Sequence, residues 1–311
     1  MSPNLRLYLA PMEGVVDVTV REYFSGLGAV DVTVTEFIRV TSQTLPDSVF
    51  LRECPELMTN AHTASGTPVV VQLLGGDPEV LTANAVQAVR LGAQHIDLNF
   101  GCPAKLVNRH DGGAVLLQFP ERIHKIVATL RKGLPDTIPV SAKMRLGFRD
   151  TGLCLANAQA IATGGASHLT VHCRTKEQMY KPPVDWTWLP RIREAARIPI
   201  VANGDIWTVA DFRRCQDISG CSEFMLGRGA LRDPWLFHKI KGLCEEDQPF
   251  DPSEFVQFFD LNQTRVSPAF AVARSKQWLR QMSDRPGFDK LFSDLKVIHN
   301  PSQFRETLKN A

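Results

Sequence analysis

Short hydrophobic runs alternate with longer stretches of helical spacing from the N-terminus to residue 243. Brief aliphatic or β-branched runs bounded by turn residues are typical of buried strands, and apolar residues three and four apart indicate amphipathic helices. The predicted strands are Leu5–Ala10, Val30–Glu36, Val69–Leu74, His95–Asn99, Val140–Arg145, Leu169–His172, Ile200–Asn203 and Phe224–Leu226. Helical spacing is clearest in Pro78–Leu91, Glu121–Leu130, Leu155–Thr163 and Val209–Asp217.

This alternation predicts an α/β protein with about eight βα units, the number that closes a (β/α)8 TIM barrel. A doubly wound parallel sheet would alternate in the same way, but it would carry a G-x-G-x-x-G turn after its first strand. The sequence has no such turn there. We therefore predict a barrel over residues 1–243.

The pattern changes after the barrel. Residues 244–252 are acidic and contain two prolines, which indicates a linker. From Phe255 onward, apolar residues return at helical spacing. Asn300-Pro301 predicts a helix start, because Asn is a common capping residue and proline fits the first helical position. We predict a small C-terminal helical bundle domain of about four helices over residues 253–311.

Composition narrows the class of protein. With 44% hydrophobic and 22% charged residues, the chain matches ordinary globular proteins, and no apolar run is long enough to span a membrane. The first predicted strand follows the N-terminus closely, so we expect no signal peptide. Seven cysteines without a C-x-x-C pair argue against a disulfide framework or a metal site, and we expect a cytoplasmic protein.

Charge is distributed unevenly along the chain. The net charge is +2, yet residues 262–311 alone carry nine Lys or Arg against four Asp or Glu. A basic module beside a mildly acidic barrel favours a polyanionic substrate. A solvated helical surface is the alternative explanation of the same count.

A cysteine stands where the fourth predicted strand becomes a loop, in the segment Asn99–Pro103. Gly101 lets the backbone bend, and Pro103 restricts the direction in which the chain leaves. Barrel enzymes carry their reactive groups at the carboxyl ends of the strands, so Cys102 is a candidate catalytic residue. A buried structural thiol is the alternative, because free cysteine is among the most buried residue types.

Polar residues end several other predicted strands. Strand alternation puts Ser141, Lys143 and Arg145 on one face, and an inward lysine needs an acceptor or an anion such as the N1/C2 edge of a flavin. The alternative is an outward Lys143 that extends along the surface. Gln72 and His172 have the donors and acceptors to bind a flavin or a uracil, although His172 also fits a core position.

Two glycine-containing segments indicate a phosphate site. Asn203–Asp205 follow the seventh predicted strand, and Gly227-Arg228 follow the eighth. Barrel enzymes often hold a phosphate between these two loops, where glycine admits it close to backbone N–H groups and arginine supplies a fork of donors. The pair therefore predicts a phosphorylated cofactor, with Pro11–Glu13 after the first strand lying against its ring.

These motifs, in order and over nearly the whole predicted barrel, resemble those of the tRNA-dihydrouridine synthases. The matching segments are Ala10–Met12, Gln72-Leu73, Asn99–Pro103, Gly112–Ala114, Lys143–Arg145, His172–Thr175, Ala202–Asp205 and Gly227–Ala230. Pro11–Val15, Thr35–Phe37 with Arg39, and Lys276–Leu279 are most similar to the bacterial C-type subfamily. Arg109, His110 and Asp111 stand where the family has a glycine-rich turn, which leaves open the path of the loop after Cys102.

The resemblance implies an NADPH-dependent oxidoreductase that binds FMN tightly and reduces a uridine of tRNA to 5,6-dihydrouridine. Hydride would pass from the flavin N5 to C6 of the base, and Cys102 would donate a proton to C5 as the catalytic residue. The expected target is uridine 16 of the D-loop, and we expect a monomer.

The resemblance also assigns binding residues. Cofactor contacts are expected from Pro11, Met12, Glu13, Gln72, Lys143, His172, Asn203, Gly204, Asp205, Gly227 and Arg228. Contacts with tRNA are expected from Arg39, Asn99, Lys105, Arg174 and Lys176 on strand-end loops near the barrel mouth, and from Arg274, Lys276 and Arg280 on a helix of the bundle.

Two other functions fit part of the sequence. A flavin barrel that reduces free pyrimidines, resembling dihydroorotate or dihydropyrimidine dehydrogenases, would explain the barrel motifs but leave the basic bundle without a role. A non-catalytic RNA-binding protein on a barrel scaffold would bind no flavin and would not depend on Cys102.

Overall fold

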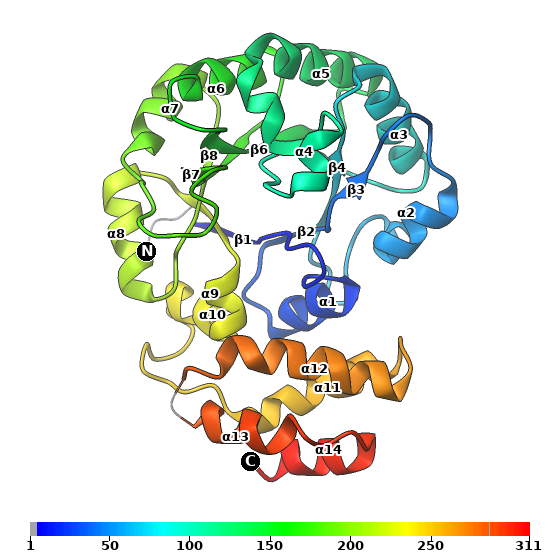
Figure 1. Cartoon of the computed structure of the whole chain (residues 1–311), viewed down its shortest axis with the longest axis vertical. Helices are drawn as coiled ribbons and strands as arrows, with labels where there is room; N and C mark the ends of the chain where they lie inside the picture. The colour runs from blue at the N-terminus through cyan, green and yellow to red at the C-terminus, as the bar shows by residue number, and fades with distance from the viewer. Residues whose placement is uncertain (1–4, 286) are drawn as a thin grey trace.

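Parallel strands close into a barrel, and a helical bundle lies against one side of it, below the barrel in Figure 1. The computed structural model describes residues 5–285 and 287–311. Within them, the sheet runs in the order β2-β1-β9-β8-β7-β6-β5-β4-β3, and a β2–β4 pairing closes it. The strands are β1 Arg6–Leu9, β2 Val32–Val34, β3 Ile38–Arg39, β4 Val69–Leu74, β5 Ile96–Phe100, β6 Val140–Gly147, β7 Leu169–Thr175, β8 Ile200–Asn203 and β9 Glu223–Leu226.

The predicted TIM barrel is confirmed, with one strand divided in two. The predicted strand Val30–Glu36 ends at Val34, and β3 continues alongside β4 at Ile38. The break frees the Glu36 side chain, whose Oε1 accepts a hydrogen bond from the backbone N–H of Val15 at 2.9 Å. This hydrogen bond links the loop between β2 and β3 to the loop after β1 at the carboxyl end of the barrel.

Helices surround the barrel, and neighbouring helices pack in chain order. They are α1 Val18–Leu27, α2 Asp47–Glu53, α3 Pro78–Arg90, α4 Lys105–Arg109, α5 Pro120–Gly133, α6 Cys154–Thr163, α7 Trp188–Ala196, α8 Val209–Ser219, α9 Arg228–Arg232 and α10 Leu236–Lys241. The four helices predicted from spacing are present as α3, α5, α6 and α8. Side chains of Asp77 and Thr208 cap α3 and α8. The predicted stretches do not include α1, α2, α4, α7, α9 and α10; of these, α2, α4, α9 and α10 have five to seven residues and are too short to show helical spacing.

Strand alternation separates the core from the barrel interior, as predicted. Val140, Ala142 and Met144 face the surrounding helices and are fully buried in the main core. Ser141 and Lys143 face inward, where Ser141 Oγ donates to Asp97 Oδ1 at 2.6 Å. The interior is thus polar along β4–β6, and this polar strip leads up to the carboxyl end of the strands.

The bundle consists of α11 Phe255–Gln263, α12 Pro268–Met282, α13 Phe288–Leu295 and α14 Pro301–Lys309. The predicted start of α14 is confirmed, because the Asn300 side chain accepts a hydrogen bond from the Gln303 N–H at 3.0 Å. Trp278 of α12 joins the bundle to the barrel. Its ring stacks on Phe24 at 5.3 Å between centroids, and its Nε1–H donates to the Leu231 carbonyl at 2.8 Å.

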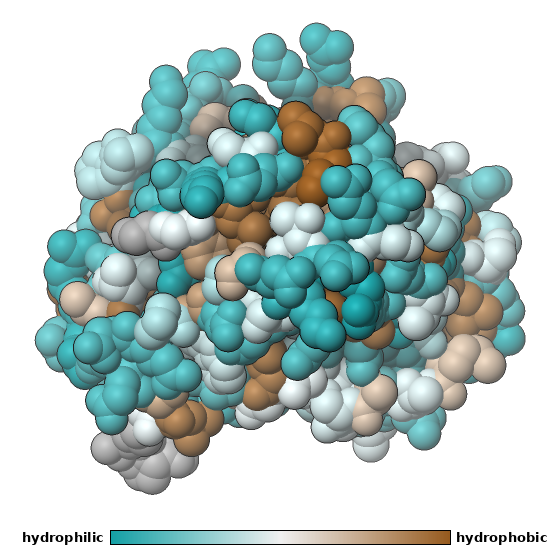
Figure 2. All heavy atoms as spheres, turned by 90° about the horizontal axis from the view of Figure 1, so that it is seen from below, coloured by the Kyte–Doolittle hydropathy of each residue, from teal (hydrophilic) through white to brown (hydrophobic). Residues whose placement is uncertain are grey.

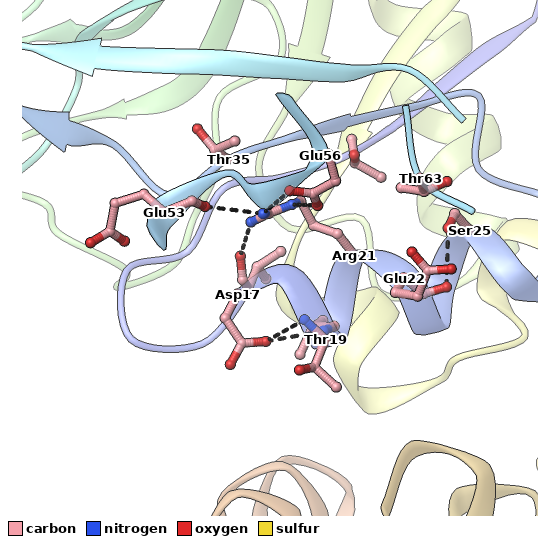
Figure 3. A network of polar contacts seen from close by, with 12 residues as sticks. Asp17, Thr19, Arg21, Glu22, Ser25, Thr35, Glu53, Glu56 and Thr63 are labelled. Carbon is pink, nitrogen blue, oxygen red and sulfur yellow. Dashed lines mark hydrogen bonds and ion pairs between the residues drawn. The ribbon is translucent and has the colours of Figure 1, made fainter. Parts of the chain in front are cut away.

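Arg274 forms a second, polar joint between α12 and the barrel. Its guanidinium donates to the carbonyl oxygens of Gly14 and Val15 and to the Asp17 carboxylate, at 2.6–3.1 Å. On the barrel side, Arg21 is fully buried and bound to both carboxylate oxygens of Glu56 (Figure 3). The structure therefore gives Arg274 a role inside the molecule, and its contact with RNA stays a prediction.

The last helix of the barrel ends at Lys241, and the next element begins at Pro252. We therefore propose residues 244–252 as the connection between a barrel of residues 1–243 and a helical domain of residues 253–311. Residues 1–4 and 286 of that division lie outside the described residues. No helix within residues 5–285 or 287–311 has the length and apolar character needed to cross a membrane.

Candidate active site

A cavity of about 480 Å³ opens at the carboxyl ends of the barrel strands. All eleven predicted cofactor residues line it, from Pro11 after β1 to Arg228 after β9, and so do Asn99 and Cys102. The structure thus gathers residues from loops more than 200 positions apart into one pocket of a size that suits a small organic cofactor.

A chain of hydrogen bonds inside the barrel leads to the cysteine. Gln72 Nε2 donates to Asp97 Oδ2 at 2.7 Å, and Asn99 Nδ2 donates to Gln72 Oε1 at 2.8 Å. Asn99 Oδ1 then accepts from the backbone N–H groups of Gly101 and Cys102, at 2.9 Å each. The amides of Gln72 and Asn99 therefore hold the Cys102 loop as well as facing the cavity.

Cys102 lines the cavity, and the residue is 8% exposed. Burial raises the pKa of this thiol, the nearby Glu13 raises it further, and a backbone hydrogen bond and the charges of Arg145 and Arg39 oppose the shift. A thiol with a raised pKa stays protonated at neutral pH, so it is suited to give up a proton and poorly suited to act as a nucleophile.

The structure defines the path of the loop after Cys102, which contains Arg109, His110 and Asp111. Arg109 ends α4, and the chain turns at Asp111 and Gly113, which have φ angles of 56° and 67°. At Gly113 a Cβ would lie 2.9 Å from the Cys102 carbonyl oxygen and 3.1 Å from its Cβ. Because only glycine admits this approach, the glycine pair after Asp111 sets the position of the cysteine.

Lys143 points into the cavity from β6, and the predicted inward orientation is confirmed. Its Nζ donates to Asn203 Oδ1 at 3.1 Å, while Asn203 Nδ2 donates to the Met225 carbonyl at 2.8 Å. Burial, followed by the charge of Arg145, lowers the pKa of Lys143 from 10.5 to about 8. The site thus holds an ammonium group next to open space, where an anionic or electron-rich ligand would stabilise it.

Lys143→Met is expected to stabilise the cofactor-free protein at pH 7. A pKa lowered from 10.5 to about 8 means that carrying the proton destabilises the fold below pH 8, by at most about 3 kcal/mol. Between pH 8 and 10.5 the folded wild type has lost this proton while the unfolded chain still carries it. The stability of the wild type therefore rises with pH relative to the variant over that range. Urea unfolding at pH 7 and 10.5 measures the difference, with the exposed Lys125→Met as control. A wild type more stable than Lys143→Met at pH 7 would contradict the assignment.

The two predicted phosphate loops lie side by side. A Cβ on Gly229, just after Arg228, would lie 2.0 Å from the Ile206 carbonyl oxygen, so the loops after β8 and β9 approach too closely for any side chain there. Arg228 Nη2 donates to Asp205 Oδ1 at 2.9 Å, and its guanidinium lies over the Tyr180 ring at 4.9 Å and over the Trp207 ring at 5.0 Å from the ring centroids. Asp205 therefore orients the arginine, which presents a fixed cation beside glycine backbone.

Arg145 and Tyr180 line the cavity although they are outside the predicted site. Arg145 donates to the carbonyl oxygens of Gly101 at 2.9 Å and Met179 at 2.8 Å, so it connects the Cys102 loop to the loop after β7. Its guanidinium lies 5.2 Å from the Tyr180 ring. Its place on the same strand face as Lys143 was a usable signal, whereas Tyr180 lies in a loop without any periodic pattern.

The predicted tRNA contacts divide into two groups. Arg174 is a correction: it lies within β7, is fully buried, and pairs with Asp205. Lys276 donates to the Lys296 carbonyl at 2.8 Å and so links α12 to the end of α13. Five of the predicted cations keep exposed surface: Lys105 and Arg280 are exposed, and Arg39, Lys176 and Lys276 are half-buried.

Comparison with known proteins agrees with this geometry. The family model described as "Dihydrouridine synthase (Dus)" matches residues 8–310. The tRNA-dihydrouridine(16) synthase of Ralstonia nicotianae is 54% identical over 246 residues, which cover 79% of this chain and 75% of that protein. The protein of the same name from Shewanella oneidensis is 43% identical over 312 residues, which cover 99% of this chain and 98% of that protein.

A solved structure shares the fold at low sequence identity. The DHODH of Eimeria tenella, in complex with ferulenol, has a TM-score of 0.57 and 11% identity, over 83% of this chain and 82% of that chain. The resemblance noted in the sequence is confirmed by the family match and by relatives at 43% and 54% identity. This chain belongs to the dihydrouridine synthase family.

Proposed function

We propose that the protein reduces the C5–C6 bond of a uridine in tRNA to 5,6-dihydrouridine, with FMN as cofactor and NADPH as reductant. The observation that carries this proposal is the placement of the Cys102 thiol in one cavity with Lys143 and with the glycine and arginine of two loops that suit a phosphate. The names of the two relatives support uridine 16 as the target position.

The residues present fit FMN. The loops after β8 and β9 offer glycine backbone and Arg228 to its phosphate, and the close approach at Gly229 keeps those loops together. Lys143 and His172 reach the cavity from adjacent strands, and Gln72 keeps one amide proton beyond its bond to Asp97. Pro11, Met12 and Glu13 supply the wall after β1. Bound FMN, once reduced by NADPH, supplies a hydride to C6 of the uracil.

Cys102 supplies the other half of the reduction. As hydride adds to C6, the electron pair of the double bond takes the proton of the Cys102 thiol at C5, and the resulting thiolate regains a proton from water. The raised pKa keeps the thiol protonated until this step. Arg145 and Asn99 hold the loop on both sides of the thiol, through the Gly101 carbonyl and the Cys102 N–H.

The surface around the cavity suits a polyanion. Arg39, Lys105 and Lys176 lie within three residues of Phe37, Ala104 and Met179, which line the cavity, and α12 brings Gln281 to the cavity wall while the adjacent Arg280 is exposed. Figure 2 shows the face at the bundle end, which is mainly hydrophilic with a larger hydrophobic group in its upper middle. We propose that tRNA lies across this region as a partner of a monomeric enzyme, and that its target base leaves the stack to enter the cavity.

The test is the product. Unmodified tRNA is incubated with the FMN-loaded protein and NADPH. The positions of dihydrouridine in the RNA are then mapped, using the saturated C5–C6 bond that distinguishes this nucleoside from uridine. We expect reduction at position 16 and none of free uridine. Reduction of free uridine or uracil without RNA would favour a free-pyrimidine reductase instead, and no dihydrouridine at all would refute the proposal.

A further inference from the structure

The loop between β1 and α1 connects the cavity to the bundle. Its first part, Pro11–Glu13, lines the cavity together with Val15, and its second part, Gly14-Val15, accepts hydrogen bonds from α12 through its two carbonyl groups. The two parts form one turn, because the Met12 carbonyl oxygen accepts hydrogen bonds from the N–H groups of both Val15 and Val16, at 2.9 Å each. Displacement of Gly14–Val16 therefore displaces the cavity wall.

Arg274 holds this turn from the bundle. Its Nη1 donates to the Gly14 carbonyl at 2.8 Å, and its Nη2 donates to the Val15 carbonyl at 2.6 Å and to Asp17 at 2.7 Å. Gln277, on the next turn of α12, donates to the same Gly14 carbonyl at 3.0 Å. A guanidinium reaches all three acceptors at once because its five donors lie in one rigid plane. Only 9% of Arg274 is exposed, so these bonds are shielded from water.

The barrel holds the same turn from the opposite side. Glu36 accepts from the Val15 N–H, and Arg21 donates to the Val16 carbonyl at 3.2 Å while Glu56 holds its guanidinium (Figure 3). The inward end of the turn reaches the phosphate loop, since a Cβ on Gly227 would lie 3.4 Å from the Met12 sulfur. The turn thus spans from α12 to the loop after β9.

We propose that Arg274 is a positioning residue that fixes the turn Met12–Val16 from the bundle and thereby sets the affinity of the cavity for FMN. This inference rests on the proposed occupancy of the cavity by FMN. It makes the bundle part of the cofactor site as well as part of the proposed RNA surface. Without Arg274, the Val15 carbonyl loses its donor from α12 and the Gly14 carbonyl keeps only the bond from Gln277, so α12 holds the turn behind the Pro11–Glu13 wall more weakly.

The test compares full-length variants by FMN titration, followed by flavin fluorescence. Arg274→Gln is expected to raise the FMN Kd about tenfold, because FMN must then order the short loop that Arg274 holds in the wild type. Arg274→Lys is expected to raise the Kd by less, because lysine keeps the positive charge but lacks the planar set of guanidinium donors. Gln277→Leu removes the bond to the Gly14 carbonyl and the bond that Gln277 Oε1 accepts from Arg274 Nη1, both at an exposed side chain, and is expected to raise the Kd about twofold. Arg305→Gln is the control, since Arg305 forms a bidentate pair with Asp260 on the exposed surface of the bundle, with both bonds at 2.7 Å and without contact to the turn.

Hydrogen exchange in the FMN-free chain gives a second measurement. The amides of Val15 and Val16 are expected to exchange faster in Arg274→Gln than in Arg305→Gln. Equal exchange in these two variants, or an FMN Kd that rises as much in Arg305→Gln as in Arg274→Gln, would overturn the inference. A wild type that binds no FMN would refute the proposed function, and the exchange comparison would still decide whether Arg274 holds the turn.

Discussion

Replacing Cys102 with alanine is expected to slow tRNA-dependent oxidation of the reduced enzyme by about 10²–10⁴-fold, while reduction by NADPH proceeds at the wild-type rate. The thiol is the proton donor in the proposed reaction, and its raised pKa keeps that proton in place at neutral pH. The cysteine acts only in the oxidative half-reaction, in which the uracil is reduced, because no uracil is present when NADPH reduces the flavin. Stopped-flow absorbance under anaerobic conditions measures the two half-reactions separately.

Cys173→Ala is the matched control for this experiment. Cys173 lies in β7 next to His172, is fully buried, and does not line the cavity, so its loss removes a thiol of similar burial without removing the proton donor. We expect wild-type rates in both half-reactions. If tRNA oxidised the reduced flavin as fast in Cys102→Ala as in Cys173→Ala, the proton would have to come from a group other than Cys102.

Gly229→Ala is expected to weaken FMN binding by about 100-fold or more. The new Cβ would lie 2.0 Å from the Ile206 carbonyl oxygen, so the loops after β8 and β9 must separate. These loops supply the proposed phosphate contacts, and charge-assisted hydrogen bonds of that kind contribute about 1.5–3 kcal/mol each. Losing one or two of them accounts for the expected change in affinity. FMN titration of the full chain measures it.

Gly26→Ala serves as the control because a Cβ there meets nothing within 4 Å, on the exposed face of α1. We expect unchanged FMN affinity and near-wild-type thermal stability. An unchanged FMN affinity in Gly229→Ala would show that the phosphate lies elsewhere, and would remove the main structural support for FMN as the cofactor.

Local sequence rules predicted most of the barrel because each strand has one face against helices and one face inside. Alternation placed Lys143 inward and Met144 outward, and both positions are confirmed. The same rule was available for Arg174, which shares its strand face with His172 and therefore points inward to Asp205. The predicted strand ended at His172, three positions before the observed end of β7 at Thr175, so Arg174 was assigned to a loop. The ends of strands are the positions that local patterns define least well.

The contacts between distant segments could not be predicted. Arg274 looked like a surface cation on a basic helix, and its role depends on carbonyl groups about 260 positions away in the chain. Tyr180 lies in a non-periodic loop, so only the folded chain shows it near Arg145 and Arg228. Such contacts follow from how the bundle and the loops pack, which a periodic pattern does not encode.

The most direct test of the proposed activity is single-turnover oxidation of the reduced flavin. The purified protein is loaded with FMN, reduced anaerobically with NADPH, and mixed either with unmodified tRNA or with free uridine, while flavin absorbance is followed. We predict rapid reoxidation by tRNA alone, with one dihydrouridine formed per flavin oxidised. Reoxidation by uridine as fast as by tRNA, or a protein that acquires no flavin signal after addition of FMN, would contradict this account.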